Sequence, residues 1–355
     1  AAMRHTHADR LAFAPADGRA APRVMVIAEI GVNHDGCAQR AVQLVAAAAD
    51  AGADAVKLQL FDPRHLLSNQ ARLAAYQADA NERDVFDMLD RLKLDLDAMR
   101  AVRDAARQRG LGFIVTPFSL EDIDALAALD VDAVKIASPD AVNTPLVRAA
   151  AGLGRAMLVS TGTAALDELE PAVALIRDRP ACLLQCISSY PTPVHEARLG
   201  AMGAMAQRFG LPVGYSDHTT ELMTGALAVA AGACVIEKHF NYDRGAAGPD
   251  HRASFEPAQF AEYAGLIRAA AAALGPRAKR QVRIDDEVRD ICRQSVCAAR
   301  DLPAGHVLTA GDLTVRRPGT GIPAAELDAV IGLRLSRAVR GGDLLQPTDV
   351  REQAA

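Results

Sequence analysis

The sequence predicts an α/β protein, a parallel (β/α)8 or TIM barrel followed by a small β-rich domain. Two observations predict the barrel: eight short apolar runs alternate with Ala- and Leu-rich stretches of helical period, and a glycine follows many of those stretches. A third observation predicts the second domain. Beyond residue 275, short β runs separated by turn glycines replace the alternation of apolar runs and helical stretches. A doubly wound open sheet is the competing topology, but eight units without a glycine-rich dinucleotide motif after the first strand argue against it.

The expected elements follow in order from residue 23. The apolar runs predicted as strands are 24–30, 55–60, 112–118, 133–138, 156–161, 182–189, 211–218 and 234–240. The stretches predicted as helices include 38–51, 95–109, 121–129, 166–177, 221–231 and 257–273. A long insertion at 62–91 interrupts the regular spacing. The glycines expected to cap helices at their carboxyl ends are Gly52, Gly110, Gly154, Gly210 and Gly232.

The same pattern sets the expected domain boundaries. We expect a flexible N-terminal arm at 1–22, the barrel at 23–275, a linker at 276–290 and the β-rich domain at 291–355. The arm has no periodicity and lacks the apolar region of a secretory signal. The linker opens with a basic, unpatterned stretch, which a solvated connection explains better than nucleic-acid binding.

The last domain contains an internal repeat. The segment 300–313 aligns without gaps on 337–350, which lies 37 residues later. The matching pairs are Arg300/Arg337, Gly305/Gly342, Leu308/Leu345 and Asp312/Asp349. Such a repeat predicts a pseudo-symmetric β module.

Composition excludes several classes of function. A formal net charge of −5, with both signs well mixed, gives no electrostatic case for nucleic acid or an anionic membrane as a partner. No apolar run approaches the roughly 20 residues of a membrane span. The 6 cysteines form no CxxC pair and several lie in apolar runs, so we expect reduced thiols in a cytoplasmic protein.

Ionisable and hydroxyl side chains gather where the predicted strands end, which is where a parallel barrel places its functional site. The expected rim residues are Glu29, Lys57, Gln59, Thr116, Lys135, Ser138, Ser160, Thr161, Ser188, Tyr190, Ser216, His218, Glu237 and His239. Because alternate residues of a strand share a face, Glu237 points the same way as His239, whereas Lys238 faces the helices.

Two rim lysines, Lys57 and Lys135, together with the hydroxyl groups, favour a phosphate cradle. Two alternatives stay open. A buried lysine can be the Schiff-base amine of an aldolase, and rim carboxylates can simply neutralise both ammonium groups.

Two imidazoles, His218 and His239, end neighbouring predicted strands. Their ring nitrogens suit Mn, Fe, Co or Zn. Two ligands are too few for a closed structural metal site, so positions would stay open for water or substrate.

Several short motifs of the chain resemble those of a known enzyme family. They are AEIGVNHDG (28–36), KLQ (57–59), TPF (116–118), KIAS (135–138), STG (160–162), YPTP (190–193), YSDHT (215–219), EKHF (237–240) and GPDH (248–251). Over about residues 23–350 the chain resembles the sialic acid synthase (N-acetylneuraminate synthase) family, which carries a C-terminal antifreeze-like (SAF) domain of β-clip type. Those enzymes condense phosphoenolpyruvate with an N-acylated hexosamine such as N-acetylmannosamine, giving a nine-carbon 2-keto-3-deoxy acid and phosphate by C–O cleavage.

The resemblance implies a role for each matching residue. It implies that His218 and His239 hold a divalent metal, Mn with Mg or Co as alternatives, that polarises the sugar aldehyde. Glu29 would handle the proton of the water that adds to phosphoenolpyruvate. The residues implied to bind phosphoenolpyruvate are Lys57, Thr116, Lys135, Ser138, Ser160, Ser188 and Ser216. Those implied to bind the sugar are Gln59, Asp140, Tyr190, Asp250 and Arg317.

Two departures from the family pattern leave the acceptor open. Many relatives have Glu at the position of Asp140 and Asn at that of Ser188. The alternative acceptors are a diacetamido-trideoxyhexose leading to legionaminic or pseudaminic acid, a sugar phosphate, or a sugar of specialised metabolism.

The loop RRPGTGIP at 316–323 bears on assembly. The resemblance implies that Arg317 reaches the N-acyl group of a sugar bound in the partner subunit's barrel, and therefore that the protein is a domain-swapped homodimer. A non-catalytic sugar-binding or ice-binding protein is the alternative from another class, and the many charged rim residues argue against it.

Overall fold

Two structural units make up the chain, residues 1–277 and 278–355, and each is described by itself. The computed structural model describes residues 22–74, 77–78, 82–276 and 283–352. Apart from Pro22, the expected arm at 1–22 lies outside the described residues, as does the part of the expected linker at 277–282.

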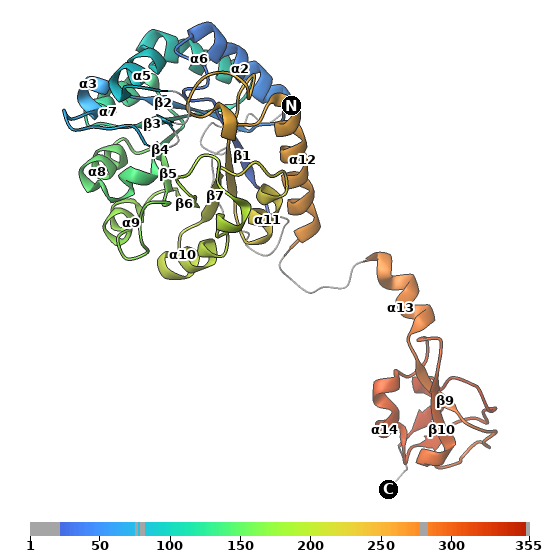
Figure 1. Cartoon of the computed structure of the whole chain (residues 1–355). Coiled ribbons are helices and arrows are strands. Elements are labelled where there is room, and N and C mark those ends of the chain that lie inside the picture. The colour runs from blue at the N-terminus through green and yellow to red at the C-terminus, as the bar shows by residue number, and fades with distance from the viewer. Residues whose placement is uncertain (1–21, 75–76, 79–81, 277–282, 353–355) are drawn as a thin grey trace. The chain divides into compact units, whose positions relative to one another are not determined.

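Eight parallel strands form a closed barrel in the order of the sequence, and β1 pairs with β8 to close it. Figure 1 shows β1 to β7 inside the surrounding helices. The predicted (β/α)8 fold is therefore confirmed. The strands are β1 Met25–Glu29, β2 Ala55–Leu60, β3 Gly112–Pro117, β4 Ala133–Ile136, β5 Ala156–Ser160, β6 Ala181–Gln185, β7 Val213–Asp217 and β8 Val235–His239. The expected strand at 182–189 is too long at its carboxyl end. That at 133–138 stops at Ile136, because Ser138–Val142, with Pro139 in its first turn, forms a 3-10 helix.

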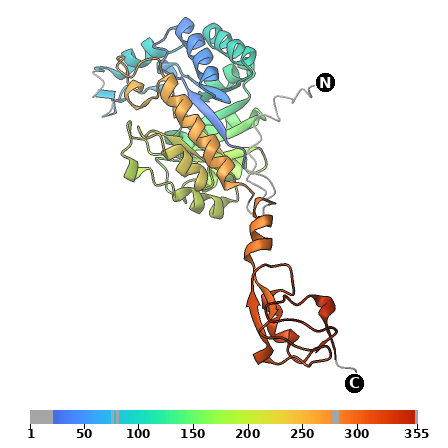
Figure 2. The ribbon, with the colours of Figure 1, turned by 90° about the vertical axis from the view of Figure 1, so that its right-hand side faces the viewer.

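Helices surround the strands, and Figure 2 shows the longest one, α12, lying along the outside of the barrel. They are α2 Ala38–Asp50, α6 Leu96–Gln108, α7 Asp122–Leu129, α8 Thr144–Gly152, α9 Glu170–Ile176, α10 Ala201–Phe209, α11 Thr224–Ala230 and α12 Pro257–Leu274. All five glycines expected as caps have positive φ, from +68° to +106°, which is the backbone conformation that favours glycine. Within the described residues, no helix is long and apolar enough to cross a membrane.

Inward-facing residues change from apolar to polar along the barrel axis. Near the amino ends of the strands the interior is filled by Met25, Ile27, Ala55, Ile114, Ala133, Leu158, Cys182, Leu184, Cys234 and Val235. The next inward residues toward the carboxyl ends are charged or hydroxylated, such as Lys57 and Glu237. The apolar layer closes the barrel below and leaves the upper end for a site.

The insertion after β2 forms a separate apolar cluster. Its described residues include the short helices α3 Pro63–Leu66 and α5 Val85–Leu92. Met88 and Leu92 of α5 pack with Val32 and Phe61, which follow β1 and β2. This apolar insertion is a wall beside the carboxyl ends of the strands.

The second unit confirms the predicted repeat in detail. Its helices are α13 Asp286–Cys292 and α14 Leu327–Val330, and its strands are β9 Ser295–Ala298, β10 Leu313–Arg316, β11 Arg334–Leu335 and β12 Val350–Arg351. The carboxylates of Asp312 and Asp349 each accept from the matching arginine, Arg300 or Arg337, and each closes a capping box. Gly305 and Gly342 both have positive φ, and Leu308 and Leu345 are both buried. Residues 286–290, expected within a linker, instead form part of α13.

Candidate active site

A cavity of about 650 Å³ opens at the carboxyl ends of the barrel strands. Most of the predicted site residues line it, which confirms that the sequence brings them to one place. They are Lys57, Gln59, Thr116, Lys135, Ser138, Asp140, Ser160, Ser188, Tyr190, Ser216, His218, His239 and Asp250. Three predicted residues are not among the lining residues: Glu29, which lies deeper, Thr161, whose hydroxyl donates to the Leu184 carbonyl at 3.1 Å, and Arg317, which belongs to the second unit.

A chain of buried charges crosses the cavity floor. Lys57 Nζ lies 2.6 Å from Glu29 Oε2 and 3.8 Å from Glu237 Oε1. Lys135 Nζ donates to the same Glu237 Oε1 at 2.9 Å. Strand register explains this, because Glu29 pairs with Lys57 across β1 and β2, and Ile27 pairs with Glu237 across β1 and β8. The alternative in which rim carboxylates form ion pairs with Lys57 and Lys135 is therefore confirmed for both lysines.

This pairing sets the charge of each group. Burial alone would raise the pKa of Glu237, but Lys135 and Lys57 outweigh it and lower that pKa to about 2. Burial opposes the charge of Lys57 as well, yet Glu237 and Glu29 raise its pKa above the ordinary value. Burial dominates at Lys135 and lowers its pKa. Glu237 is thus ionised at neutral pH and holds Lys57 in its charged form.

Hydroxyl groups line the side of the cavity formed by the ends of β4, β5 and β6. Ser138 Oγ accepts from the Thr163 backbone N–H at 2.8 Å and lies 3.1 Å from Ser188 Oγ. Ser160 Oγ is buried and makes no hydrogen bond. Gly162 permits this packing, because a Cβ there would lie 2.7 Å from Cys186 O and 3.0 Å from Ser188 Oγ. A free buried hydroxyl in a cavity that two lysines also line suits an anionic ligand.

The two predicted imidazoles lie together, with ring centroids 5.4 Å apart. Tyr190 stacks on His218 at 4.1 Å and meets His239 edge-on at 5.5 Å. Burial lowers the pKa of His218 to about 4, and burial followed by the field of His218 lowers that of His239 well below its ordinary value. Both rings are therefore neutral at pH 7, the form that binds metals.

The donor set fits a divalent metal bound by these two rings. His218 Nδ1 lies 2.7 Å from the Ile187 carbonyl, so it carries the proton and Nε2 is left to ligate. His239 Nδ1 is buried and makes no hydrogen bond. Among the described residues no group of three His, Cys, Asp or Glu side chains is placed to hold a metal, so this site would keep open positions.

The residues implied to bind the sugar are held by polar contacts of their own. Gln59 Nε2 donates to Glu29 Oε1 at 3.0 Å, and Asp140 accepts from Asn143 at 3.1 Å. Asp250 Oδ2 lies 3.6 Å from His239 Nδ1. Burial, reinforced by Glu29, raises the pKa of Asp250 to about 7. Asp250 therefore exchanges a proton near neutral pH.

Three features of the site were not predicted from the sequence. Glu237 was expected at the rim beside the imidazoles, but its pairing with both lysines was not assigned to it. Asn33 donates to Phe240 O and Ser254 Oγ, and Ser254 donates to Asp250 O, so Asn33 tethers the loop that carries Asp250. The third is the apolar insertion, which lines the cavity through Met88 and other residues.

Comparisons with known proteins agree with this fold. A family model described as the NeuB family matches residues 44–279, and a SAF domain model matches residues 293–351. An N,N'-diacetyllegionaminic acid synthase of Campylobacter jejuni is 36% identical, over 91% of this chain and 99% of its own length. One of the same name from Legionella pneumophila is 37% identical, over 90% and 92%. A crystal structure of N-acetylneuraminic acid synthetase from Leptospira borgpetersenii, in complex with citrate, superposes with a TM-score of 0.69 at 30% identity, covering 75% of this chain and 90% of that one.

The barrel, its site and the SAF domain define a nonulosonate synthase, a phosphoenolpyruvate-dependent transferase that forms a carbon–carbon bond. Within that class, the chain belongs to the NeuB family.

Proposed function

We propose that this enzyme condenses phosphoenolpyruvate with an N-acylated hexose to give a nine-carbon 2-keto-3-deoxy sugar acid and phosphate. Carbon 3 of phosphoenolpyruvate bonds to the sugar aldehyde carbon, water oxygen adds at carbon 2, and the C2–O bond to phosphate breaks. The observation that supports this most is that two lysines and two neutral imidazoles line the same cavity. One pair suits the anionic donor and the other suits the carbonyl of the acceptor.

The lysines and hydroxyls would bind the phosphate and carboxylate of phosphoenolpyruvate. Lys57 stays charged because its pKa is raised, and the free hydroxyl of Ser160 adds a donor without charge. Glu237 holds both ammonium groups at fixed positions before the donor arrives, which lowers the reorganisation needed during the reaction.

The imidazoles of His218 and His239 would hold a divalent metal, Mn with Mg or Co as alternatives. Such an ion, when bound, polarises the sugar carbonyl as a Lewis acid. The chain supplies two neutral ring nitrogens and keeps them in place through Tyr190 and the Ile187 carbonyl. Their burial excludes bulk water, so a developing alkoxide would be stabilised strongly here.

Glu29 remains our proposal for the carboxylate that takes a proton from the attacking water. Burial raises its pKa, while Lys57 opposes the rise. It is fully buried and hydrogen-bonds Gln59, which lines the cavity. A proton would therefore reach Glu29 past Lys57 and Gln59 rather than by direct contact with the cavity.

The apolar side chains of the insertion, together with the two phenylalanines that pack beside it, favour a deoxygenated acceptor, a diacetamido-trideoxyhexose as in legionaminic acid synthesis, over N-acetylmannosamine. Phe61, Met88, Leu89 and Phe118 line the cavity, and a hydroxyl or phosphate against such side chains would lose its hydrogen bonds to water. A methyl group and acetyl methyl groups would instead gain by burial there. The two relatives named as N,N'-diacetyllegionaminic acid synthases are consistent with this choice.

We also propose a cytoplasmic, domain-swapped homodimer in which Arg317 completes the sugar site of the partner subunit. Arg317 is exposed in the second unit, on the loop that follows β10. A planar guanidinium on an exposed loop is available to an acyl carbonyl.

The test is phosphate release from phosphoenolpyruvate across a panel of acceptors: the diacetamido-trideoxyhexose, N-acetylmannosamine and its 6-phosphate. We expect phosphate release with these N-acylated hexoses, and the highest kcat/KM with the trideoxy sugar. Equal or better kcat/KM with the 6-phosphate would contradict the acceptor assignment. Borohydride trapping of pyruvate on Lys135 would instead identify a Schiff-base aldolase, the alternative that its lowered pKa favours.

A further inference from the structure

A second polar cluster lies between the barrel strands and the outer helices, behind the imidazoles. It comprises Asp217, Thr219, Thr224, Lys238 and Tyr263, and each of these residues is at most 1% exposed. None of them lines the cavity. They therefore cannot touch a substrate there, and their role has to be exerted through neighbouring residues.

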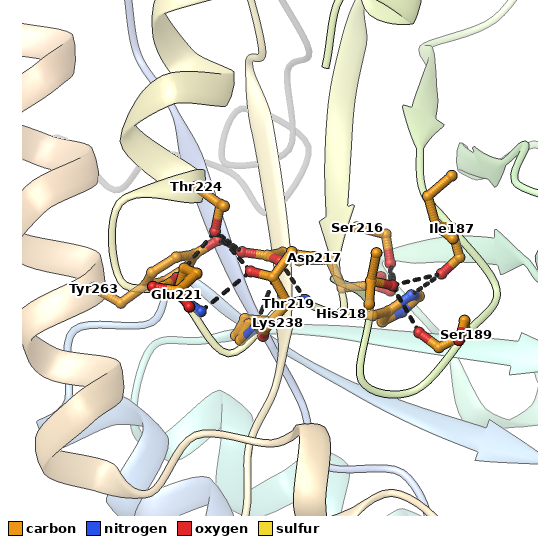
Figure 3. Close-up of polar contacts among 12 residues, drawn as sticks. Ile187, Ser189, Ser216, Asp217, His218, Thr219, Glu221, Thr224, Lys238 and Tyr263 are labelled. Carbon is orange, nitrogen blue, oxygen red and sulfur yellow. Dashed lines mark hydrogen bonds and ion pairs between the residues drawn. The ribbon is translucent and has the colours of Figure 1, made fainter. Parts of the chain in front are cut away.

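The carboxylate of Asp217 is the centre of this cluster, as Figure 3 shows. Thr224 Oγ1 and Tyr263 hydroxyl both donate to Asp217 Oδ2 at 2.6 Å. The backbone N–H of Thr219 donates to Asp217 Oδ1 at 2.8 Å, and Lys238 Nζ lies 3.6 Å from the same oxygen. Lys238 Nζ also donates to the Thr219 carbonyl and lies 4.1 Å from the centre of the Phe255 ring.

Each imidazole residue directly follows a member of this cluster. His218 comes after Asp217, and His239 comes after Lys238. Asp217 and Lys238 are also register partners between β7 and β8. The side chain of His218 points away from the cluster, toward Ile187 (Figure 3). One carboxylate thus ties together the two strand ends from which the rings project into the cavity.

Helix α12 joins the cluster only because α11 makes room for it. A Cβ on Gly225, near the start of α11, would lie 2.5–2.8 Å from ring atoms of Tyr263. Glycine at this position lets the Tyr263 hydroxyl reach Asp217. The turn between β7 and α11 is therefore held from both sides, by Lys238 of the neighbouring strand and by Tyr263 of α12.

Stability alone is a weak explanation for such a cluster. Replacing a buried ion pair by apolar residues of similar volume is often neutral or even stabilising. A network whose polar groups are joined by several hydrogen bonds does, however, fix one geometry of the backbone around it.

We propose that Asp217, Lys238, Thr224 and Tyr263 form a positioning network that sets the relative placement of the His218 and His239 rings. The proposal rests on the metal role of those rings in the proposed function. Groups one step removed from metal ligands typically change metal affinity by about 10- to 100-fold when they are altered. The network would have this effect through the backbone rather than through a hydrogen bond to the rings.

The experiment measures Mn²⁺ affinity of the full-length protein by titration followed with electron paramagnetic resonance, alongside thermal melting of the metal-free protein. Tyr263→Phe and Thr224→Val each remove one hydroxyl donor and keep the shape of the side chain. We expect each to weaken Mn²⁺ binding by about tenfold and to broaden the spectrum of the bound ion. kcat should fall, while KM for phosphoenolpyruvate should stay the same.

Two matched variants separate positioning from packing. Thr224→Ser keeps the hydroxyl and loses a methyl group, so positioning predicts near wild-type Mn²⁺ affinity, whereas a packing role predicts a larger loss than in Thr224→Val. Tyr242→Phe removes a similar tyrosine-to-aspartate hydrogen bond, 2.7 Å to Asp35, away from the network, and should leave Mn²⁺ affinity unchanged.

Equal Mn²⁺ affinity in the wild type, Tyr263→Phe and Thr224→Val would overturn this inference and leave the proposed function standing. Absence of Mn²⁺ binding by the wild type would overturn the metal role and this inference together. A loss in Thr224→Ser that exceeds the loss in Thr224→Val would also overturn it.

Discussion

At the scale of single residues, Glu237 connects most of the site. One of its oxygens, Oε1, accepts from Lys135 and Ser216, both at 2.9 Å, and lies within ion-pair distance of Lys57. No other described residue contacts both lysines by ion pairs. Its lowered pKa means that this charge persists through the physiological range.

Glu237→Gln should therefore destabilise the protein strongly. The change leaves Lys135 without its ion-pair partner in a buried position, and such a loss typically costs about 3–5 kcal/mol. Urea denaturation measures the free energy of unfolding. Glu82→Gln, which breaks the exposed pair with Arg91, is the control and should cost about 1 kcal/mol or less. Equal effects of the two changes would contradict the role of Glu237.

The two imidazoles make stability depend on pH. The pKa of His218 is about 4 in the folded protein against 6.5 when unfolded, and that of His239 is also lowered. Between these two pKa values the unfolded chain binds more protons than the folded chain. The contribution of the imidazoles to the free energy of unfolding is therefore fully present above pH 6.5 and is lost as the pH falls toward 4. Thermal melting of the metal-free protein across this range checks the slope. His218→Asn should flatten it, and an unchanged slope in that variant would contradict the assignment.

Alternation along strands made the inward set of rim residues predictable, because a period of two is a property of the strand itself. That is why Lys57, Lys135 and His239 were placed correctly, and why Lys238 was expected among the helices, where it lies. The depth of Glu29 could not be predicted in this way. It depends on how two neighbouring side chains, Lys57 and Gln59, fold over it.

At the scale of elements, loops that follow the strands decide the shape of the cavity. The end of β5 and the loop after β6 approach each other at Gly162, where only hydrogen fits against Cys186 and Ser188. This contact could not be predicted from the sequence, although Gly162 belongs to the motif STG that was identified there. The hydrogen bond from Asn33 to Ser254 could not be predicted either, because the two residues are 221 positions apart and no local sequence pattern indicates their contact.

Gly162→Ala should displace the loop after β6 and with it Ser188. A displacement near 1 Å can lower kcat/KM by about 10²-fold. Gly203→Ala is the matched control. It is exposed in α10, its added Cβ meets nothing within 4 Å, and the change should stabilise the helix by about 0.5–1 kcal/mol without affecting kinetics. Equal kcat/KM for the two variants would show that the close contact at Gly162 has no functional consequence.

At the scale of the whole molecule, the two units were predictable to different depths. The barrel followed from eight strand–helix units, and the second unit from its gapless repeat, whose Arg–Asp pairs became matching ion pairs. The helix α13 was not expected, because the basic stretch before it has no pattern.

Mixing inactive variants tests the proposed exchange between subunits. Arg317→Ala and His218→Ala should each be nearly inactive alone. In a domain-swapped dimer, a mixed pair contains one intact site, so an equimolar, re-equilibrated mixture should regain about a quarter of wild-type activity. Phosphate release measures it. A mixture no more active than its components, or a fully active monomer, would contradict the swap.

The most direct measurement of the central claim is phosphate release before and after removal of divalent metal. Wild-type enzyme with phosphoenolpyruvate and the trideoxy acceptor should lose release on exhaustive chelation and recover it when Mn²⁺ is added back. His218→Ala and His239→Ala should stay inactive in Mn²⁺, because each removes one of the two ring ligands. Full phosphate release by the chelated wild type, or recovery by either variant in Mn²⁺, would contradict a site in which these two imidazoles hold a catalytic metal.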